Sequence, residues 1–196
     1  MLNYGLVYRV DVPFSRPPDV SSGRPARGKT EFPDMKTRQP SDRKIQIAVI
    51  GGRNASKHVL GLAEEVGRRI AESGAVLVCG GLGGVMEAAC RGAKQAGGVT
   101  IGILPADRLQ DANPYVDAVV ATGMGVARNA LVVHSCRGAV AVGGSYGTLS
   151  EIAFALQERK PVVSLKSWTV DEHVVRAETS EEAVRKILEM IAIAET

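Results

Sequence analysis

The feature of the sequence that most restricts its fold is the stretch at residues 138–151, GAVAVGGSYGTLSE. Its apolar start is typical of a buried strand, and a glycine-rich turn and the first turn of a helix follow directly. The first backbone N–H groups of a helix have no partner within the helix, and its aligned peptide dipoles favour negative charge there. Because glycine lets the backbone approach a ligand without an intervening Cβ, this stretch predicts a site for an anion such as phosphate.

The composition favours an α/β protein. Apolar residues make up 45% of the chain but aromatic residues only 4%, so we expect a core of Val, Ile, Leu and Ala, and the 22 glycines suit many tight turns. No apolar run approaches the length of a membrane-spanning helix, and residues 1–14 lack the apolar core of a signal peptide. Cys79, Cys90 and Cys136 show no metal-binding spacing. We therefore expect a cytoplasmic protein with packed, reduced thiols, no metal and no membrane contact.

The first 43 residues differ from the rest of the chain. They hold six of the nine prolines and show no hydrophobic periodicity after Phe14, so we expect a flexible extension at 1–43 and a folded domain at 44–196. Residues 23–30, GRPARGKT, match the P-loop pattern but lack its preceding strand and following helix, and we interpret them as part of this basic extension. Beyond residue 44 the net charge is −1, which gives no support for a nucleic-acid partner.

Strands and helices alternate through the predicted domain. Apolar runs predict strands at 45–50, 75–79, 99–104, 117–121, 138–142 and 161–165, with a short seventh at 174–175. Helical periodicity fills the segments between them, with Ser56 as the N-cap of the first helix and Thr179 with Glu182 as a capping box for the last. The alternation predicts a doubly wound, Rossmann-like parallel sheet of six or seven strands, with helices on both faces and strand order 3-2-1-4-5-6.

Glycine pairs follow three of these strands, at 51–52, 80–81 and 143–144. Because doubly wound sheets bind ligands at the carboxyl ends of their strands, we expect the pairs to surround one site. Arg128, at the start of a predicted helix at 126–135, follows the fourth strand. Most such arginines lie at the surface, but the guanidinium fork is well suited to binding phosphate.

Thr148 and Glu151 lie three residues apart at the start of the helix after the glycine loop. This spacing fits a capping box, in which each side chain binds the other's backbone N–H. It fits equally a carboxylate at the floor of a nucleotide site. The two interpretations are compatible.

Two further motifs suggest other activities. The GGSYG segment matches G-x-S-x-G, which makes Ser145 a candidate esterase nucleophile. His173 is the only histidine downstream, Asp171 is too near it in sequence to orient it, and no HGGG-type segment is present. Residues 81–86 approach the dinucleotide fingerprint, but Met86 replaces its last small residue. Both hypotheses are weaker than the phosphate loop.

Four motifs, at residues 80–89, 97–105, 128–129 and 143–151, occur in the order and spacing of one superfamily. Over residues 44–195 the chain resembles the Rossmann-like group that contains the Lonely Guy phosphoribohydrolases, often mislabelled lysine decarboxylases, and the molybdenum cofactor carrier proteins. The resemblance implies a homodimer. The hydrolases cleave a nucleoside 5′-monophosphate to base and ribose 5-phosphate, and their catalytic Arg and Glu match Arg128 and Glu151. A carboxylate there suits an oxocarbenium-like transition state.

The sequence departs from the hydrolase motifs. Asn129 replaces a Lys, Val142 replaces a Pro, and residues 124–127 lack a His. These departures resemble the carrier branch, which implies binding of an AMP-like nucleotide or the molybdenum cofactor, with no required cofactor and with phosphoribohydrolysis as the alternative. The residues expected to contact the ligand are Gly51, Gly52, Gly80, Gly81, Gly84, Met86, Arg128, Asn129, Gly143, Gly144, Ser145, Tyr146, Gly147, Thr148 and Glu151.

Overall fold

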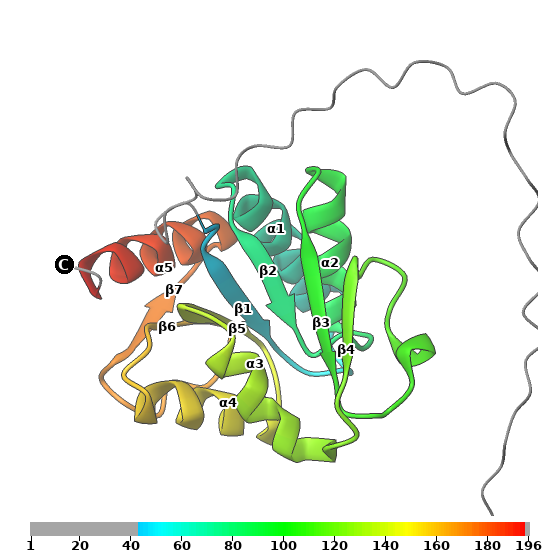
Figure 1. The fold of residues 1–196 in the computed structure, drawn as a ribbon. Helices are drawn as coiled ribbons and strands as arrows, with labels where there is room; N and C mark the ends of the chain where they lie inside the picture. The colour runs from blue at the N-terminus through cyan, green and yellow to red at the C-terminus, as the bar shows by residue number, and fades with distance from the viewer. Residues whose placement is uncertain (1–42, 195–196) are drawn as a thin grey trace, which may run out of the picture. The chain divides into compact units, whose positions relative to one another are not determined.

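Seven parallel strands form one sheet in the computed structural model, which describes residues 43–194 (Figure 1). The P-loop-like residues 23–30 and all but the last residue of the predicted extension lie outside the described residues. The strands are β1 (Gln46–Ile50), β2 (Val76–Cys79), β3 (Thr100–Leu104), β4 (Ala118–Ala121), β5 (Gly138–Val142), β6 (Val162–Leu165) and β7 (Val174–Ala177). Their order in the sheet is β4-β3-β2-β1-β5-β6-β7.

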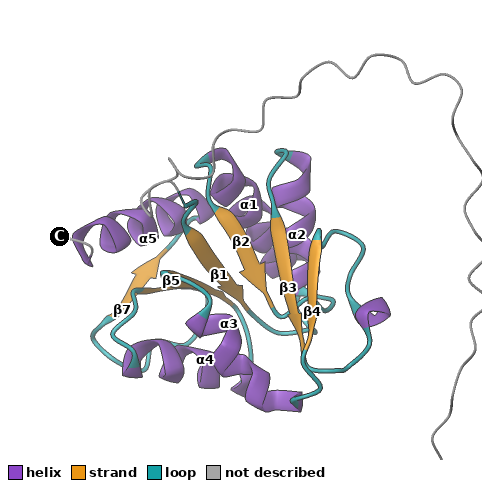
Figure 2. Ribbon diagram, in the orientation of Figure 1, coloured by secondary structure: helices purple, strands orange, loops and turns teal. Residues whose placement is uncertain are grey.

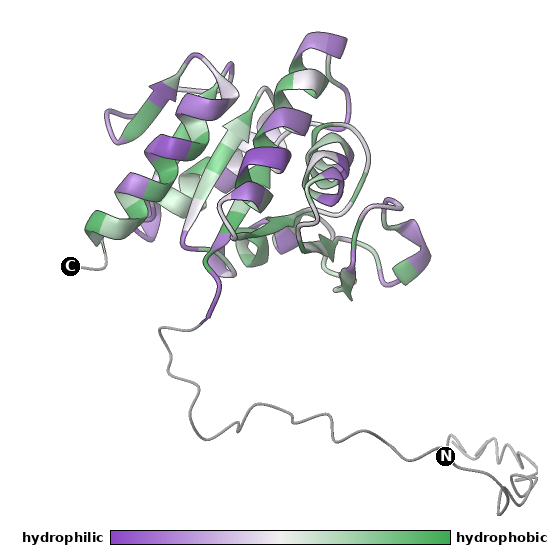
Figure 3. Ribbon diagram, turned by 90° about the horizontal axis from the view of Figure 1, so that it is seen from above, coloured by the Kyte–Doolittle hydropathy of each residue, from purple (hydrophilic) through white to green (hydrophobic). Residues whose placement is uncertain are grey.

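Helices cover both faces of the sheet, which confirms the predicted doubly wound, Rossmann-like fold (Figure 2). They are α1 (Lys57–Glu72), α2 (Val85–Gln95), α3 (Asn129–His134), α4 (Tyr146–Gln157) and α5 (Ser180–Ala194), with 3₁₀ turns η2 (Leu109–Asp111) and η3 (Gly125–Arg128). One buried cluster joins the sheet to α1, α2 and α5, and a second joins it to α3 and α4. The long helices carry both hydrophilic and hydrophobic residues, as expected when one side is buried (Figure 3).

The predicted strand order 3-2-1-4-5-6 is wrong. The fourth strand, β4, pairs with β3 at the edge of the sheet, and β5 takes the place beside β1. Residues 105–117 separate β3 from β4 and contain the short turn η2 but no α-helix, and Asp117 links the two strands by accepting a 2.9 Å hydrogen bond from the backbone N–H of Thr100. All residues of β5 are buried, whereas none of β4 is, and this difference suits a central and an edge strand respectively.

The predicted helix ends are largely confirmed. Ser56 Oγ accepts a 3.3 Å hydrogen bond from the N–H of Val59, and Thr179 Oγ1 accepts one of 3.1 Å from the N–H of Glu182. The Glu182 carboxylate accepts from the N–H of Glu178, one residue earlier than a capping box requires. The segment expected as one helix at 126–135 is instead a 3₁₀ turn followed by α3.

The two helices that precede and follow β2, α1 and α2, approach one another at backbone level. A Cβ on Gly67 of α1 would overlap the carbonyl oxygen of Ala89, and one on Gly92 of α2 would overlap that of Glu64. Glycine at both positions therefore permits a helix contact that no larger residue allows. This contact fixes α2, whose first turn borders the candidate site.

We expect Gly92→Ala to lower the free energy of unfolding by about 2–4 kcal/mol, because the helices must separate and leave voids between them. Gly61→Ala is the matched control on α1, since no atom lies within 4 Å of a Cβ there. It should stabilise the protein by about 0.5–1 kcal/mol through helix propensity. Urea unfolding of both variants measures the difference. Equal stabilities of the two variants would contradict the close contact.

Candidate functional site

A cavity of about 210 Å³ opens at the carboxyl ends of the strands. The loops after β1 to β5 all contribute to its wall. The lining residues are Gly51, Gly52, Arg53, Leu82, Met86, Pro105, Gly125, Val126, Arg128, Asn129, Ser145, Gly147, Thr148 and Glu151. Most of the predicted site residues thus meet in one place.

Three of the predicted glycines that do not line the cavity, Gly80, Gly84 and Gly144, lie against residues that do. A Cβ on Gly80 would overlap the guanidinium of Arg128. Gly144 has a φ of +110°, and a Cβ there would overlap the Thr148 side chain. Gly84, Gly81 and Gly143 also have positive φ angles, which favour glycine. The close contacts and the positive φ angles give a structural reason for glycine at these positions, and their contact with a ligand stays a prediction.

Helix α4 begins at the cavity with an open N-terminus. It starts at Tyr146, and its N-cap residue Ser145 makes no side-chain capping bond. Thr148 is 2% exposed, and within residues 43–194 its Oγ1 has no hydrogen-bond partner. The capping-box interpretation of Thr148 and Glu151 is therefore wrong, because neither side chain binds the other's backbone. The structure instead leaves a buried hydroxyl beside unpaired helix N–H groups.

Arg128 and Glu151 face each other in the cavity wall. Both are buried, and Arg128 Nη1 lies 4.0 Å from Glu151 Oε1, a loose ion pair. Burial lowers the pKa of Arg128, the Glu151 carboxylate raises it, and nearby Arg53 lowers it. Burial raises the pKa of Glu151 to about 7, although Arg128 opposes the shift. Arg128 Nε also lacks a partner among the described residues. The pair can thus hold an anion and exchange a proton near neutral pH.

This arrangement coincides with the region that a known family model matches. The model of the SLOG cluster4 family covers residues 44–195. The chain belongs to the SLOG cluster4 family. This membership, together with the structural relatives below, confirms the expected place in the Lonely Guy superfamily, on its carrier-like branch.

The relatives of this SLOG cluster4 chain include two solved carrier-type proteins. The molybdenum cofactor binding protein of Rippkaea orientalis is 38% identical, with a TM-score of 0.73, over 76% of this chain and 98% of that one. The molybdenum cofactor carrier protein of Chlamydomonas reinhardtii is 36% identical, with a TM-score of 0.71, over 77% and 99%. An uncharacterized protein of Archaeoglobus fulgidus is 50% identical over 141 residues, which are 71% of this chain and 92% of the relative.

Two predicted residues have structural contacts that the sequence did not suggest. Asn129 lines the cavity, but its amide donates to Ser150 Oγ at 2.9 Å and to the Gly147 carbonyl at 3.4 Å, so it joins α3 to the first turn of α4. Tyr146 is 81% exposed and stacks on Trp168, with ring centroids 6.3 Å apart, outside the cavity lining.

The cavity also contains residues that sequence analysis missed: Arg53, Leu82, Pro105, Gly125 and Val126. Arg53 directly follows a predicted glycine pair, so its position after a strand was the available signal. Leu82 and Pro105 lie within the motifs at 80–89 and 97–105, which were therefore an available signal, whereas Val126 lies in none of the four motifs.

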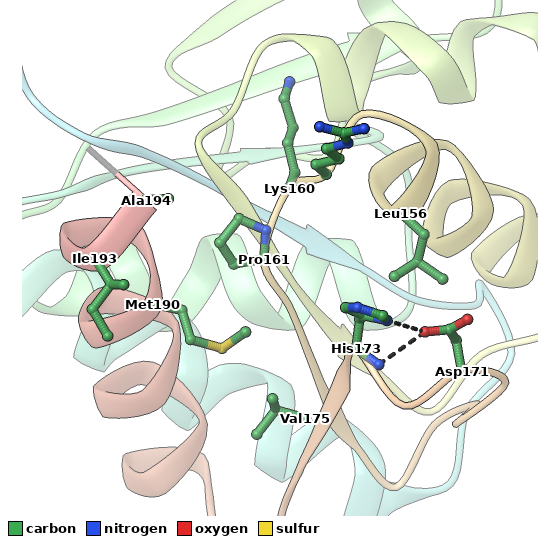
Figure 4. Close-up of a pocket in the computed structure, with 10 residues that line it drawn as sticks. Leu156, Lys160, Pro161, Asp171, His173, Val175, Met190, Ile193 and Ala194 are labelled. Carbon is green, nitrogen blue, oxygen red and sulfur yellow. Dashed lines mark hydrogen bonds and ion pairs between the residues drawn. The ribbon is translucent and has the colours of Figure 1, made fainter. Parts of the chain in front are cut away.

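A larger cavity, of about 710 Å³, lies beside the amino-terminal ends of β6 and β7 (Figure 4). His173 lies there, before β7, whereas Ser145 follows the carboxyl end of β5, so the strands separate the two residues. Asp171 Oδ1 accepts hydrogen bonds from the ring and the backbone of His173, at 2.7 and 2.8 Å, so the expectation that Asp171 is too close to orient it is wrong. The esterase hypothesis nevertheless lacks a histidine beside Ser145.

The three cysteines are buried free thiols, as predicted. Cys79 Sγ lies 3.5 Å from Cys90 Sγ and accepts a 3.3 Å hydrogen bond from the N–H of Gly81, which anchors the turn after β2. Within residues 43–194, no three His, Cys, Asp or Glu side chains gather as a metal site would require. In the same residues, no helix has the length and apolar character needed to cross a membrane.

The raised pKa of Glu151 predicts a pH-dependent stability. The folded state keeps a proton that the unfolded state releases above pH 4.5, so the free energy of unfolding should fall as the pH rises from 4.5 to about 7. Glu151→Gln removes this dependence. The stability difference between parent and variant should therefore change by on the order of 3 kcal/mol between pH 4 and 8, in favour of the variant at high pH.

Urea unfolding across this pH range measures the effect. Glu189→Gln is the control, because it removes an exposed carboxylate that pairs with Arg185 on α5. Its profile should parallel that of the parent. Parallel profiles for Glu151→Gln and the parent would show that Glu151 is not the titrating group.

Proposed function

We propose that this protein binds a phosphorylated small molecule in the cavity, as a molybdenum cofactor carrier-like protein, with the phosphate at the N-terminus of α4. The observation that carries the proposal is a pair of buried atoms, Thr148 Oγ1 and Arg128 Nε, that have no hydrogen-bond partner among the residues that the structure describes. Buried polar groups almost always have hydrogen-bond partners, and leaving one without costs free energy. An anion in this cavity is suited to accept from both groups and from the first N–H groups of α4.

Both polar and apolar residues line the cavity. Arg53, Arg128 and the start of α4 supply positive potential, while Leu82, Met86, Pro105 and Val126 supply apolar surface. Val126 is 85% exposed, which leaves it available to a ligand at the cavity mouth. These features support an amphipathic ligand with a phosphate and a flat ring, such as an AMP-like nucleotide or the molybdenum cofactor. The names of the two solved carrier-type relatives favour the cofactor.

Thr148→Val separates a binding role of the hydroxyl from a structural one. Since Thr148 Oγ1 has no partner among the described residues, the variant should be at least as stable as the parent. It should bind AMP roughly tenfold more weakly, because one phosphate contact is lost. Calorimetric titration with AMP and urea unfolding give the two readouts.

Thr100→Val is the matched control, because the buried Thr100 Oγ1 donates a 2.6 Å hydrogen bond to the Tyr115 carbonyl. It should lower stability by about 1–2 kcal/mol and leave AMP binding unchanged. Unchanged AMP affinity in Thr148→Val would contradict the phosphate assignment.

The second candidate is nucleoside 5′-monophosphate phosphoribohydrolysis, favoured by the buried Glu151 with a pKa raised to about 7. Its carboxylate would stabilise positive charge on the ribose and activate water. Expected homodimerisation and cytoplasmic location remain predictions under both functions. Light scattering tests the first of these.

A free-base assay by chromatography separates the two functions. A carrier releases no adenine from AMP, whereas a hydrolase releases it. In a hydrolase, Glu151→Gln should lower the rate of adenine release at least a hundredfold and still bind AMP. If the parent protein releases adenine and Glu151→Gln abolishes this release, the carrier proposal is wrong and the protein is a hydrolase.

A further inference from the structure

Arg53 lines the cavity from the loop after β1, whereas Arg128 lines it from the segment after β4. Arg53 is exposed, and within residues 43–194 its side chain makes no hydrogen bond or ion pair. Many other cations of the described domain are paired, for example Arg91 with Glu64 at 2.7 Å and Lys94 with Asp117 at 2.7 Å. Arg53 therefore differs from them in facing a cavity without a carboxylate of its own.

The backbone of Arg53 is held in place. Gly84, the N-cap residue of α2, has a φ of +71°, and a Cβ there would overlap the Arg53 carbonyl. The preceding Gly52 carbonyl accepts a 3.1 Å hydrogen bond from the N–H of Val85. Because α2 fixes this loop, ordering the Arg53 guanidinium on a ligand costs only side-chain entropy.

Charge in the cavity is not balanced. Arg53 is close enough to Arg128 to lower its pKa, and like charges repel across the space between them. Glu151 lies 4.0 Å from Arg128, but burial raises its pKa to about 7, so near neutral pH its carboxylate compensates only about half of one cation. The N-terminus of α4 adds about half a positive charge, so a ligand with one negative charge leaves roughly one positive charge in the cavity uncompensated. A phosphate monoester carries nearly two charges at neutral pH, since its second pKa is about 6.

We propose that Arg53 binds the second negative charge of a terminal phosphate monoester, and that the site thereby selects monoesters over phosphodiesters. This inference rests on the proposed phosphate binding at α4. It assigns the ligand to mononucleotide-like molecules with a free terminal phosphate. Molecules whose phosphate is esterified on both sides, as in dinucleotides, are disfavoured.

Calorimetric titration at pH 7.5 and fixed ionic strength, with AMP and its phosphate methyl ester as probes, tests the inference. The parent should bind AMP about tenfold or more tightly than the methyl ester. Arg53→Gln should lower the affinity for AMP to that for the methyl ester and leave the affinity for the methyl ester unchanged. Arg53→Lys keeps the charge and should retain part of the preference. Arg185→Gln, which removes a cation of α5 that pairs with Glu189, should behave like the parent.

The outcomes separate this inference from the proposed function. Suppose that Thr148→Val weakens AMP binding, but Arg53→Gln weakens the binding of both probes equally or of neither. The phosphate site then stands, and the proposed role of Arg53 is overturned. If Arg53→Gln and Thr148→Val both bind AMP like the parent, the proposed site is overturned as well. The same follows if the parent binds neither AMP nor ribose 5-phosphate at millimolar concentration.

Discussion

The polar groups of the candidate site depend on close contacts with glycines that do not line it. Gly80 leaves room for the Arg128 guanidinium, and Gly144 leaves room for Thr148. The N-cap glycine of α2 does the same for the backbone of Arg53. In each case a Cβ would overlap the group that faces the cavity. The glycine-rich loops thus let these polar groups and the backbone lie close together, as the proposed phosphate binding by side chains and helix N–H groups requires.

This placement costs stability in the free protein. A buried Arg128 with a loose partner, a hydroxyl without one and a carboxyl whose pKa is raised to about 7 are each unfavourable in isolation. Two apolar clusters, one on each face of the sheet, and the close α1–α2 contact offset that cost. Among the described residues, two of the three buried side-chain atoms without a hydrogen-bond partner, Thr148 Oγ1 and Arg128 Nε, lie at this cavity, and the third, Ser167 Oγ, lies elsewhere. Functional sites often contain such departures from ordinary hydrogen bonding.

The sequence was sufficient to predict the strands, the helices between them and the edge of the sheet where the site lies. It was not sufficient for the strand order, because a short apolar run indicates a strand but not its neighbours. The exposure of β4 and the bond between Thr100 and Asp117 that determine its place are tertiary properties. Arg53 was missed for a related reason, since an arginine after two glycines has no distinctive spacing. Its significance comes from α2, which packs against its backbone.

Asn129 connects these observations to the choice between carrying and cleaving a ligand. The hydrolases that the chain resembles have a Lys at this position, next to the catalytic Arg. Here the neutral amide of Asn129 donates hydrogen bonds to Ser150 Oγ and to the Gly147 carbonyl. These bonds stiffen the first turn of α4, and the amide adds no charge. The cations left for the ligand are Arg128 and Arg53. A rigid cradle that binds the ground state tightly does not by itself lower a reaction barrier. Asn129 therefore removes a positive charge beside Arg128 and links α3 to α4, and this departure from the hydrolase motif is consistent with the carrier proposal.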